Sequence, residues 1–253
     1  MYKSKWLVTP RTIESPVVRL FCFPYAGGSA TTFIHWVKQL PAKIELNIIQ
    51  LPGRGSRIAE PLVTCLDDVV DSIYNSLKNK LDVPFIFFGH SFGSRMAFEV
   101  TVKLYNSNQP TPHYFIASAS RPPSEPVSDS FSYDLPEEEF IGRLDELNGT
   151  PKEILENKEF LDILIPMLRA DFKMAETHVH QHETKLDIPL IVLGGLNDKS
   201  VDKDTLLGWT KHFNETVQLN ILEGDHFFIE TKSNEIISYI LPFLNSTIES
   251  VSN

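Results

Sequence analysis

The segment of this chain with the clearest chemical meaning is Gly89-His90-Ser91-Phe92-Gly93. It follows the apolar run at residues 84–88 and precedes a stretch with helical spacing that begins near Ser94. A G-x-S-x-G sequence between a strand and a helix is typical of a nucleophile elbow, which lifts a serine hydroxyl above a sheet. The glycines fit, because side chains at their positions would collide with neighbouring backbone. We therefore predict that Ser91 is a catalytic nucleophile.

A serine hydroxyl is a weak nucleophile unless a base takes its proton. His226 is the best placed histidine, because it stands in Gly224-Asp225-His226-Phe227-Phe228, just after the predicted strand at residues 217–222. A loop at that position reaches the same end of the sheet as the elbow. We predict that His226 is the general base, and we interpret His90, at the variable position of the elbow, as a structural contact.

The base needs an acid that orients its ring, and in this arrangement the acid lies between the serine and the histidine in the sequence. Asp198 is the preferred candidate, because it follows the predicted strand at residues 189–193 through a short glycine-containing loop. Asp202 remains an alternative. Asp225 is disfavoured, since the side chains of adjacent residues such as Asp225 and His226 usually diverge.

Two backbone N–H groups are expected to bind the oxyanion that forms during attack. One belongs to Phe92, the residue after the nucleophile. The other is assigned to Ala26 in Phe23-Pro24-Tyr25-Ala26-Gly27-Gly28, where the glycine pair lets the backbone turn inward. Tyr25 is the alternative donor.

These residues require a scaffold that brings several loops to one edge of a sheet. Short β-rich runs alternate with stretches of helical spacing, which predicts a mainly parallel sheet with helices on both faces. The predicted strands are residues 17–23, 45–50, 84–88, 114–118, 189–193 and 217–222. The predicted helices are residues 31–40, 66–81, 94–105 and 234–244, the last interrupted by Pro242.

One long segment breaks the alternation. Residues 121–185 contain no convincing strand and several helix-prone stretches, around 137–147, 151–157 and 160–176. We predict a helical lid at about residues 122–185, inserted into a single catalytic domain that spans residues 1–253. The alternative is a helical subdomain that only packs on the edge of the sheet.

Composition narrows the possible partners and location. The chain has 23 basic and 33 acidic residues and a formal net charge of -10, which disfavours nucleic acid and anionic membranes as partners. The first residues run into a polar segment without an apolar signal core, and no apolar run is long enough to span a membrane. Two cysteines indicate no disulfide framework and fit a reducing cytoplasm. The His178, His180 and His182 trio lacks a second ligand cluster, so we expect no metal.

Several segments in one order resemble the type II, or external, thioesterases that accompany nonribosomal peptide and polyketide synthases. The resemblance runs from about Leu20 to Glu230. Two positions depart from the pattern: Tyr25 stands where the family more often has histidine, and Leu196-Asn197-Asp198 where it more often has a run of aspartates. The matching segments are Phe23-Pro24-Tyr25-Ala26-Gly27-Gly28, Gln50-Leu51-Pro52-Gly53-Arg54, Gly89-His90-Ser91-Phe92-Gly93, Leu168-Arg169-Ala170-Asp171-Phe172 and Gly224-Asp225-His226-Phe227-Phe228.

The resemblance implies an α/β-hydrolase fold and a housekeeping reaction. Such enzymes remove stalled or wrongly primed acyl groups from the phosphopantetheine arm of an acyl- or peptidyl-carrier protein, and they need no metal or cofactor. Ser91 would take the acyl group, His226 would then activate water, and the fold can work as a monomer. Specificity for thioesters rests on the resemblance, because neither composition nor motif spacing shows it.

Two other functions remain open on the sequence. A carboxylesterase or lipase would use the same triad on small oxoesters. A hydrolase-like binding module would need no chemistry, although Ser91, Asp198, His226 and the glycine-rich loop together disfavour it.

Overall fold

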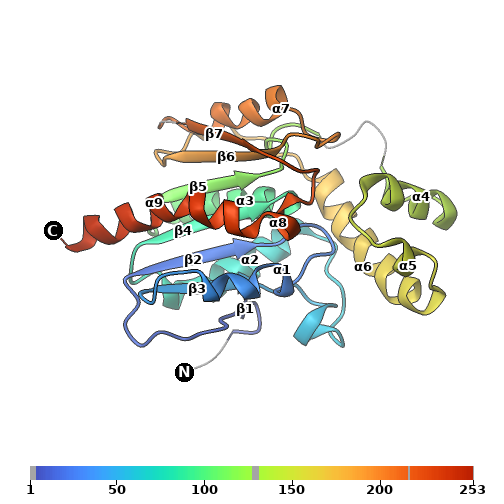
Figure 1. Cartoon of the computed structure of the whole chain (residues 1–253), viewed down its shortest axis with the longest axis horizontal. Helices are drawn as coiled ribbons and strands as arrows, with labels where there is room; N and C mark the ends of the chain where they lie inside the picture. Colours follow the sequence, from blue (N-terminus) through green and yellow to red (C-terminus); the bar gives the residue numbers. More distant parts are fainter. Residues whose placement is uncertain (1–3, 127–130, 216, 253) are drawn as a thin grey trace.

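The computed structural model describes residues 4–126, 131–215 and 217–252. Its centre is a seven-stranded sheet in the order β1-β3-β2-β4-β5-β6-β7 (Figure 1). Every neighbouring pair is parallel except β1 and β3. The strands are β1 (Leu7–Val8), β2 (Val18–Phe23), β3 (Ile44–Ile49), β4 (Phe85–His90), β5 (Tyr114–Ser118), β6 (Leu190–Gly195) and β7 (Val217–Leu222).

The predicted mainly parallel sheet flanked by helices is confirmed. Strands β2, β3, β4 and β6 are buried along their whole length, as expected for strands covered on both faces. The helices are α1 (Thr31–Ile34), α2 (Leu66–Leu77), α3 (Phe92–Asn106), α4 (Glu137–Leu147), α5 (Lys152–Leu155), α6 (Lys158–Thr177), α7 (Lys203–Leu207), α8 (Phe228–Thr231) and α9 (Ser233–Ser252). Short 3-10 helices are η1 (His35–Lys38), η2 (Gly55–Arg57), η3 (Lys78–Lys80) and η4 (Gly208–His212).

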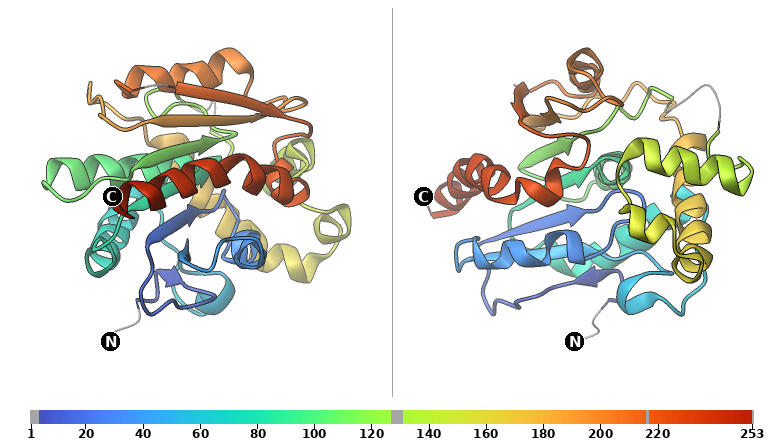
Figure 2. Two further views of the ribbon diagram at one scale, coloured as in Figure 1. Left: turned by 60° about the vertical axis from the view of Figure 1, so that its left-hand side comes forward. Right: turned by 45° about the vertical axis from the view of Figure 1, so that its right-hand side comes forward.

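Helices cover both faces of the sheet (Figures 1 and 2), and a hydrophobic cluster lies on each face. The first joins the sheet to α2 and α3 and contains Phe87, Met96 and Phe98. The second joins the opposite face to α1 and α9 and contains Phe88 and Trp36. Alternate residues of β4 therefore enter different clusters, which follows from the two-residue period of a strand. Because the sheet is packed on both faces, the carboxyl ends of its parallel strands are fixed relative to one another. The loops that follow these strands can therefore position a site.

Helices α4, α5 and α6 follow β5 and precede β6 in the sequence, and they form the segment predicted to lack strands. They form a third cluster, centred on Phe140 and Leu168. Figure 1 shows all three beside the carboxyl ends of the parallel strands, the edge where open α/β sheets bind ligands. Residues 127–130 of the predicted insertion lie outside the described residues.

Two local expectations were incomplete or wrong. Strand β1, whose two residues pair antiparallel with β3, is not among the predicted strands. Pro242 does not interrupt the last helix, because α9 runs through it to Ser252. Proline removes one helical hydrogen bond, but Ile240 and Leu244 on either side of it are fully buried against the sheet. Their packing keeps the helix continuous. Across the described residues, none of the helices has the length and apolar character needed to cross a bilayer.

Candidate active site

The segment from β4 to α3 has the geometry of a nucleophile elbow. Ser91 has φ of 53° and ψ of -123°, a strained conformation for a residue other than glycine. Its N–H donates to the carbonyl of Ser118 on β5 at 2.7 Å, which holds the turn. A Cβ atom on Gly89 would lie 2.3 Å from Ser94 Cα, and one on Gly93 would lie 2.1 Å from a backbone oxygen. Both positions therefore require glycine.

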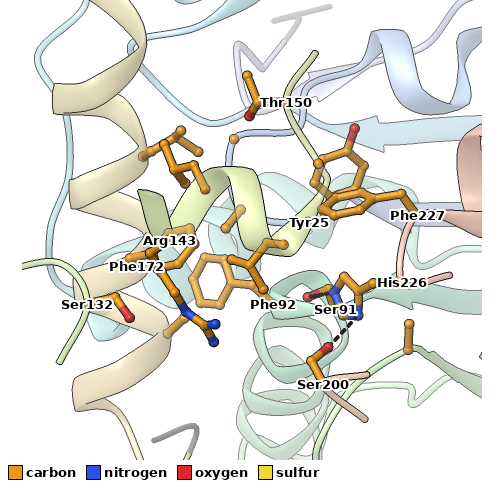
Figure 3. Close-up of a pocket in the computed structure, with 18 of the residues that line it drawn as sticks. Tyr25, Ser91, Phe92, Ser132, Arg143, Thr150, Phe172, Ser200, His226 and Phe227 are labelled. Atoms are coloured by element: carbon orange, nitrogen blue, oxygen red, sulfur yellow. Dashed lines mark hydrogen bonds between the residues drawn. The ribbon is translucent and has the colours of Figure 1, made fainter. Parts of the chain in front are cut away.

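The structure brings the three predicted triad residues into one hydrogen-bonded row. His226 Nε2 lies 2.9 Å from Ser91 Oγ, and His226 Nδ1 lies 2.7 Å from Asp198 Oδ2. A carboxylate can only accept, so Nδ1 carries the proton and Nε2 is free to accept from the serine hydroxyl. Figure 3 shows the His226 ring beside Ser91 on one side and Ser200 on the other. The tautomer is the one a general base needs.

The carboxylate of Asp198 is buried and fully engaged. Its Oδ1 accepts from Ser200 N at 2.8 Å, from Ser200 Oγ at 2.7 Å and from Val201 N at 3.2 Å. Burial acts to raise the pKa of Asp198, but the hydrogen bonds from His226 and Ser200 outweigh it and hold this pKa below its ordinary value. The carboxylate therefore stays ionised and can stabilise an imidazolium on His226.

Ser200 was absent from the predicted site. Its hydroxyl donates to Asp198 Oδ1 and also lies 3.1 Å from His226 Nδ1. Ser200 therefore contacts both members of the His226–Asp198 pair. An aspartate followed two residues later by serine often closes a local turn through such bonds. That Asp-x-Ser spacing is the sequence signal that could have identified Ser200.

His90 is a structural contact, as expected, and the structure specifies what it contacts. The fully buried ring bridges the carbonyl of His226 through Nε2 and the hydroxyl of Ser118 through Nδ1, each at 2.9 Å. Because a carbonyl only accepts, Nε2 donates and Nδ1 accepts. Burial, and second the nearby His226, lower the pKa of His90 to about 3. A neutral His90 thus fixes the backbone that carries His226.

The two other aspartates weighed for the acid lie elsewhere. Asp202 is exposed and caps α7 by accepting from Thr205 N at 2.8 Å. Asp225 accepts from Phe227 N at 2.9 Å and from Asn148 at 3.1 Å. Neither is hydrogen-bonded to His226 within the described part of the chain.

Two backbone donors line the pocket next to Ser91. Phe92 is the first residue of α3, whose N–H cannot have an intrahelical acceptor and lies at the positive end of the helix dipole. Ala26 lies in the turn after β2. Among the described residues, neither the Phe92 nor the Ala26 N–H has a hydrogen-bond acceptor. The side-chain hydroxyl of Tyr25, whose backbone N–H is the alternative donor, donates to Glu230 at 2.7 Å.

A cavity of about 520 Å³ opens above Ser91 and His226. Its floor comes from the sheet edge, including Phe92 and Phe227, and its roof from the inserted helices (Figure 3). The roof is mostly apolar: Leu144, Leu147, Ile154, Leu164, Leu168 and Phe172 line it. Such a chamber suits the apolar part of an acyl group.

The histidine trio lies away from this cavity. His178 and His180 both contact the carboxylate of Glu99, at 2.9 and 3.0 Å. Burial acts to raise the pKa of Glu99, but these two contacts outweigh it and lower the pKa to about 2. Over the residues described, no group of three or more histidine, cysteine or acidic side chains is arranged to hold a metal ion.

Comparisons with known proteins agree with this geometry. The model of the family described as "Thioesterase domain" matches residues 18–244. The chain is 37% identical to the protein named linear gramicidin dehydrogenase LgrE from Brevibacillus parabrevis, over 96% of this chain and 94% of that protein. It is 33% identical to the gramicidin S biosynthesis protein GrsT from Aneurinibacillus migulanus, over 94% of this chain and 93% of that protein.

A solved structure gives the same result in three dimensions. The crystal structure of ClbQ, from the colibactin NRPS/PKS pathway, superposes with a TM-score of 0.84 at 31% identity. The match covers 93% of this chain and 98% of ClbQ. The matched part is therefore nearly the whole of both chains.

Proposed function

The chain belongs to the thioesterase domain family, and from this premise we propose that it is a type II thioesterase with Ser91, His226 and Asp198 as its catalytic triad. It would hydrolyse stalled or aberrant acyl thioesters from the phosphopantetheine arm of carrier proteins in nonribosomal peptide or polyketide biosynthesis. Two relatives support this setting: GrsT is named for gramicidin S biosynthesis, and ClbQ comes from an NRPS/PKS pathway. The observation that carries the proposal is the hydrogen-bonded row at the floor of an apolar cavity.

The proposed reaction has two halves. In the first, Ser91 Oγ attacks the thioester carbonyl while its proton passes to His226 Nε2. The C–S bond then breaks, the departing sulfur takes that proton from His226, and a free thiol and an acyl-serine remain. In the second, His226 takes a proton from water as the water oxygen attacks the acyl-serine. The ester C–O bond then breaks, Ser91 Oγ takes that proton from His226, and the carboxylic acid is released. The N–H groups of Ala26 and Phe92 would bind the oxyanion in both halves.

The name of LgrE contains the word dehydrogenase, and we do not extend it to this chain. A serine that is hydrogen-bonded to a His–Asp pair, next to two backbone N–H groups without an acceptor among the described residues, is an arrangement suited to acyl transfer. Hydride transfer has no use for a serine nucleophile. The residues on the cavity floor therefore favour hydrolysis.

The chamber supports an acyl substrate larger than acetyl. Six apolar side chains of the inserted helices face the space above Ser91. We include in the proposal that the insertion, at about residues 122–185 of one catalytic domain, acts as a lid that admits the acyl chain. Its roof would exclude water from the acyl group and so strengthen the electrostatic contacts below.

The partner and setting follow from the same proposal. The acidic chain has a net charge of -10, so contact with an acidic carrier protein would depend on short-range surfaces rather than long-range attraction. We expect a monomer, because the triad, both oxyanion donors and the roof come from one chain. We also propose a reducing cytoplasmic location, which suits the free Cys22 and Cys65.

The test compares one acyl group on three leaving groups: the phosphopantetheine of a carrier protein, N-acetylcysteamine, and a matched oxoester. We expect the highest kcat/KM on the carrier protein, because remote binding energy helps to orient the carbonyl, and only a modest salt dependence. Equal efficiency on both thiols would remove the carrier protein from the proposal. A preference for the oxoester would favour the esterase alternative, and absent labelling of Ser91 by a phosphonate would favour the binding module.

A further inference from the structure

A buried ion pair lies beneath the turn that carries the proposed oxyanion donor. Asp171, on α6, is 0% exposed, and Arg54, in the loop after β3, is 4% exposed. The two side chains pair in a fork, with Arg54 Nη2 on Asp171 Oδ1 at 2.8 Å and Nη1 on Oδ2. The same Oδ2 accepts the N–H of Gly27 at 2.7 Å. One carboxylate therefore joins the inserted helix to two loops of the sheet edge.

The bond to Gly27 acts on the turn that contains Ala26. Gly28 N donates to the carbonyl of Tyr25 at 2.8 Å, and Gly27 has φ of 82°. A four-residue turn with this bond and a third residue near +80° is a type II turn. Its central peptide, between Ala26 and Gly27, is the one that reverses when such a turn changes to type I. Reversal would aim the carbonyl of Ala26 at Asp171, where two negative oxygens would repel.

Packing and further hydrogen bonds hold the same assembly. Leu168, one turn before Asp171 on α6, packs closely on Gly27: a Cβ there would lie 2.5 Å from Leu168 Cδ2, so the leucine side chain would have to move. The Gln50 side chain donates to the carbonyl of Arg54 at 3.1 Å and accepts from Ala30 N at 3.0 Å. The loop after β2 is thus fixed both to α6 and to the loop after β3.

We propose that Asp171 is a positioning residue for the oxyanion hole. By accepting the Gly27 N–H it holds the turn in its type II form and fixes its place beside the cavity. The Ala26 N–H belongs to the preceding peptide, between Tyr25 and Ala26, so Asp171 acts by fixing the position of the segment that carries this donor, and Arg54 orients the carboxylate for that task. The inference rests on the proposed function only through the assignment of Ala26 as a donor. It requires neither a thioester nor a carrier protein.

The single change Asp171→Ala would leave Arg54 buried without a partner and threaten the fold. The test therefore removes the charge pair and varies only the acceptor, comparing Arg54→Met with Asp171→Asn against Arg54→Met with Asp171→Leu. Asparagine can still accept from Gly27, whereas leucine has the same branched shape and no acceptor. Replacing a buried pair by apolar residues of similar size is often tolerated by the fold.

Activity would be measured on a p-nitrophenyl ester and divided by the number of active serines, obtained by end-point titration with a phosphonate. We expect the leucine variant to lose about a hundredfold in kcat, near the effect of removing one oxyanion donor, with little change in KM. Binding of a boronic acid, whose tetrahedral adduct uses the oxyanion hole, is expected to weaken in parallel. The asparagine variant is expected to keep kcat within about threefold of the starting protein, because it still accepts the Gly27 N–H. That change is far smaller than the loss expected when an oxyanion donor is removed.

The matched control is Glu45→Gln. Glu45 forms another buried ion pair, with Arg19 at 3.1 Å, at the amino ends of β2 and β3, away from Ser91. It is expected to lower stability without changing kcat per active serine. The proposal is overturned if the leucine variant keeps the starting kcat, or if the asparagine and leucine variants lose kcat equally. A starting protein that hydrolyses the oxoester but no thioester would count against the proposed function and leave this test intact.

Discussion

Replacing Asp198 by asparagine gives the sharpest test of the triad, because the surroundings of Asp198 dictate how asparagine must lie. Its Oδ1 receives three donors, from Ser200 N, Ser200 Oγ and Val201 N. An amide nitrogen in that position would face two backbone N–H groups and leave them without an acceptor. The asparagine oxygen must therefore take the Oδ1 position, and its nitrogen must face His226.

That orientation moves the proton of His226 from Nδ1 to Nε2. An amide nitrogen donates, so His226 Nδ1 would become the acceptor and Nε2 would carry the hydrogen toward Ser91. The ring could then not remove the serine proton. The same substitution in the trypsin-like triad is a known case of a wrong tautomer, and we expect a loss of about a thousandfold or more in kcat, equal to about 4 kcal/mol in the barrier.

The assay is kcat on an acyl thioester, with circular dichroism and thermal unfolding to establish that Asp198→Asn is folded. The matched variant is Asp202→Asn, which removes the charge from an exposed cap of α7 on the same loop. It is expected to keep kcat within about threefold, as surface changes usually do. Near-normal turnover in Asp198→Asn, with a large loss in Asp202→Asn, would refute the assignment of the acid.

The remaining predictions concern the Ser91–His226 pair, the inserted helices and the buried His90. Ser91→Ala and His226→Ala are each expected to remove nearly all turnover, and the double variant to be hardly worse, because the two residues act as one unit. Hydrogen exchange is expected to be slow in residues 168–177 of α6, as in the strands, and faster in α4 and α5. In the folded protein the pKa of His90 is about 3, so the ring stays neutral down to about that pH, whereas in the unfolded chain it takes up the proton near pH 6.5. The free energy of unfolding is therefore expected to fall by about 2 kcal/mol from pH 7 to pH 5 through His90, and His90→Gln to lose that part of the pH dependence.

Each of these predictions has an outcome that contradicts it. Additive losses in the double variant of Ser91 and His226 would mean that the two residues act separately. Equal protection from hydrogen exchange along α4, α5 and α6 would contradict the prediction that α4 and α5 open more readily than residues 168–177 of α6. For His90, denaturant unfolding at several pH values is the measurement, and an unchanged slope in His90→Gln would refute the buried neutral ring. His35→Gln is the control there, since His35 lies outside the cavity on η1.

The α/β-hydrolase fold could be predicted from the sequence because its signals are local. Buried parallel strands are near-continuous apolar runs, and the strand at Tyr114–Ser118 agrees with its predicted ends. The edge strand Val217–Leu222 is only partly buried, and its predicted ends also agree. The elbow was equally visible, because steric requirements place glycine on both sides of Ser91 at fixed spacing. Asp198 and His226 followed from their places after strands, since parallel strands bring their following loops to one edge.

What the sequence could not supply depends on contacts between distant segments. Asp171 lies 117 positions from Arg54 and 144 from Gly27. Its segment, residues 168–172, carries part of the family resemblance, but nothing local indicates which residues the carboxylate contacts. Pro242 reads as a break, since local propensity opposes it, and only the burial of Ile240 and Leu244 explains the unbroken helix. Strand β1 has two residues and takes its structure from β3. Tertiary packing decided each case.

The ion pair beneath the turn also limits how the proposed lid can open. If α6 swung away as a whole, Asp171 and Arg54 would separate, and both their ion pair and the hydrogen bond from Gly27 to Asp171 would be lost. Over the part of the chain that the structure describes, no buried ion pair holds the amino end of α6, where Phe160 and Ile163 are more than half exposed. Opening is therefore expected to move α4, α5 and the first turns of α6, while the remainder of α6 stays on the sheet edge. A lid divided in this way would admit an acyl chain without disturbing the turn that holds Ala26, so access and oxyanion binding could be altered by separate mutations.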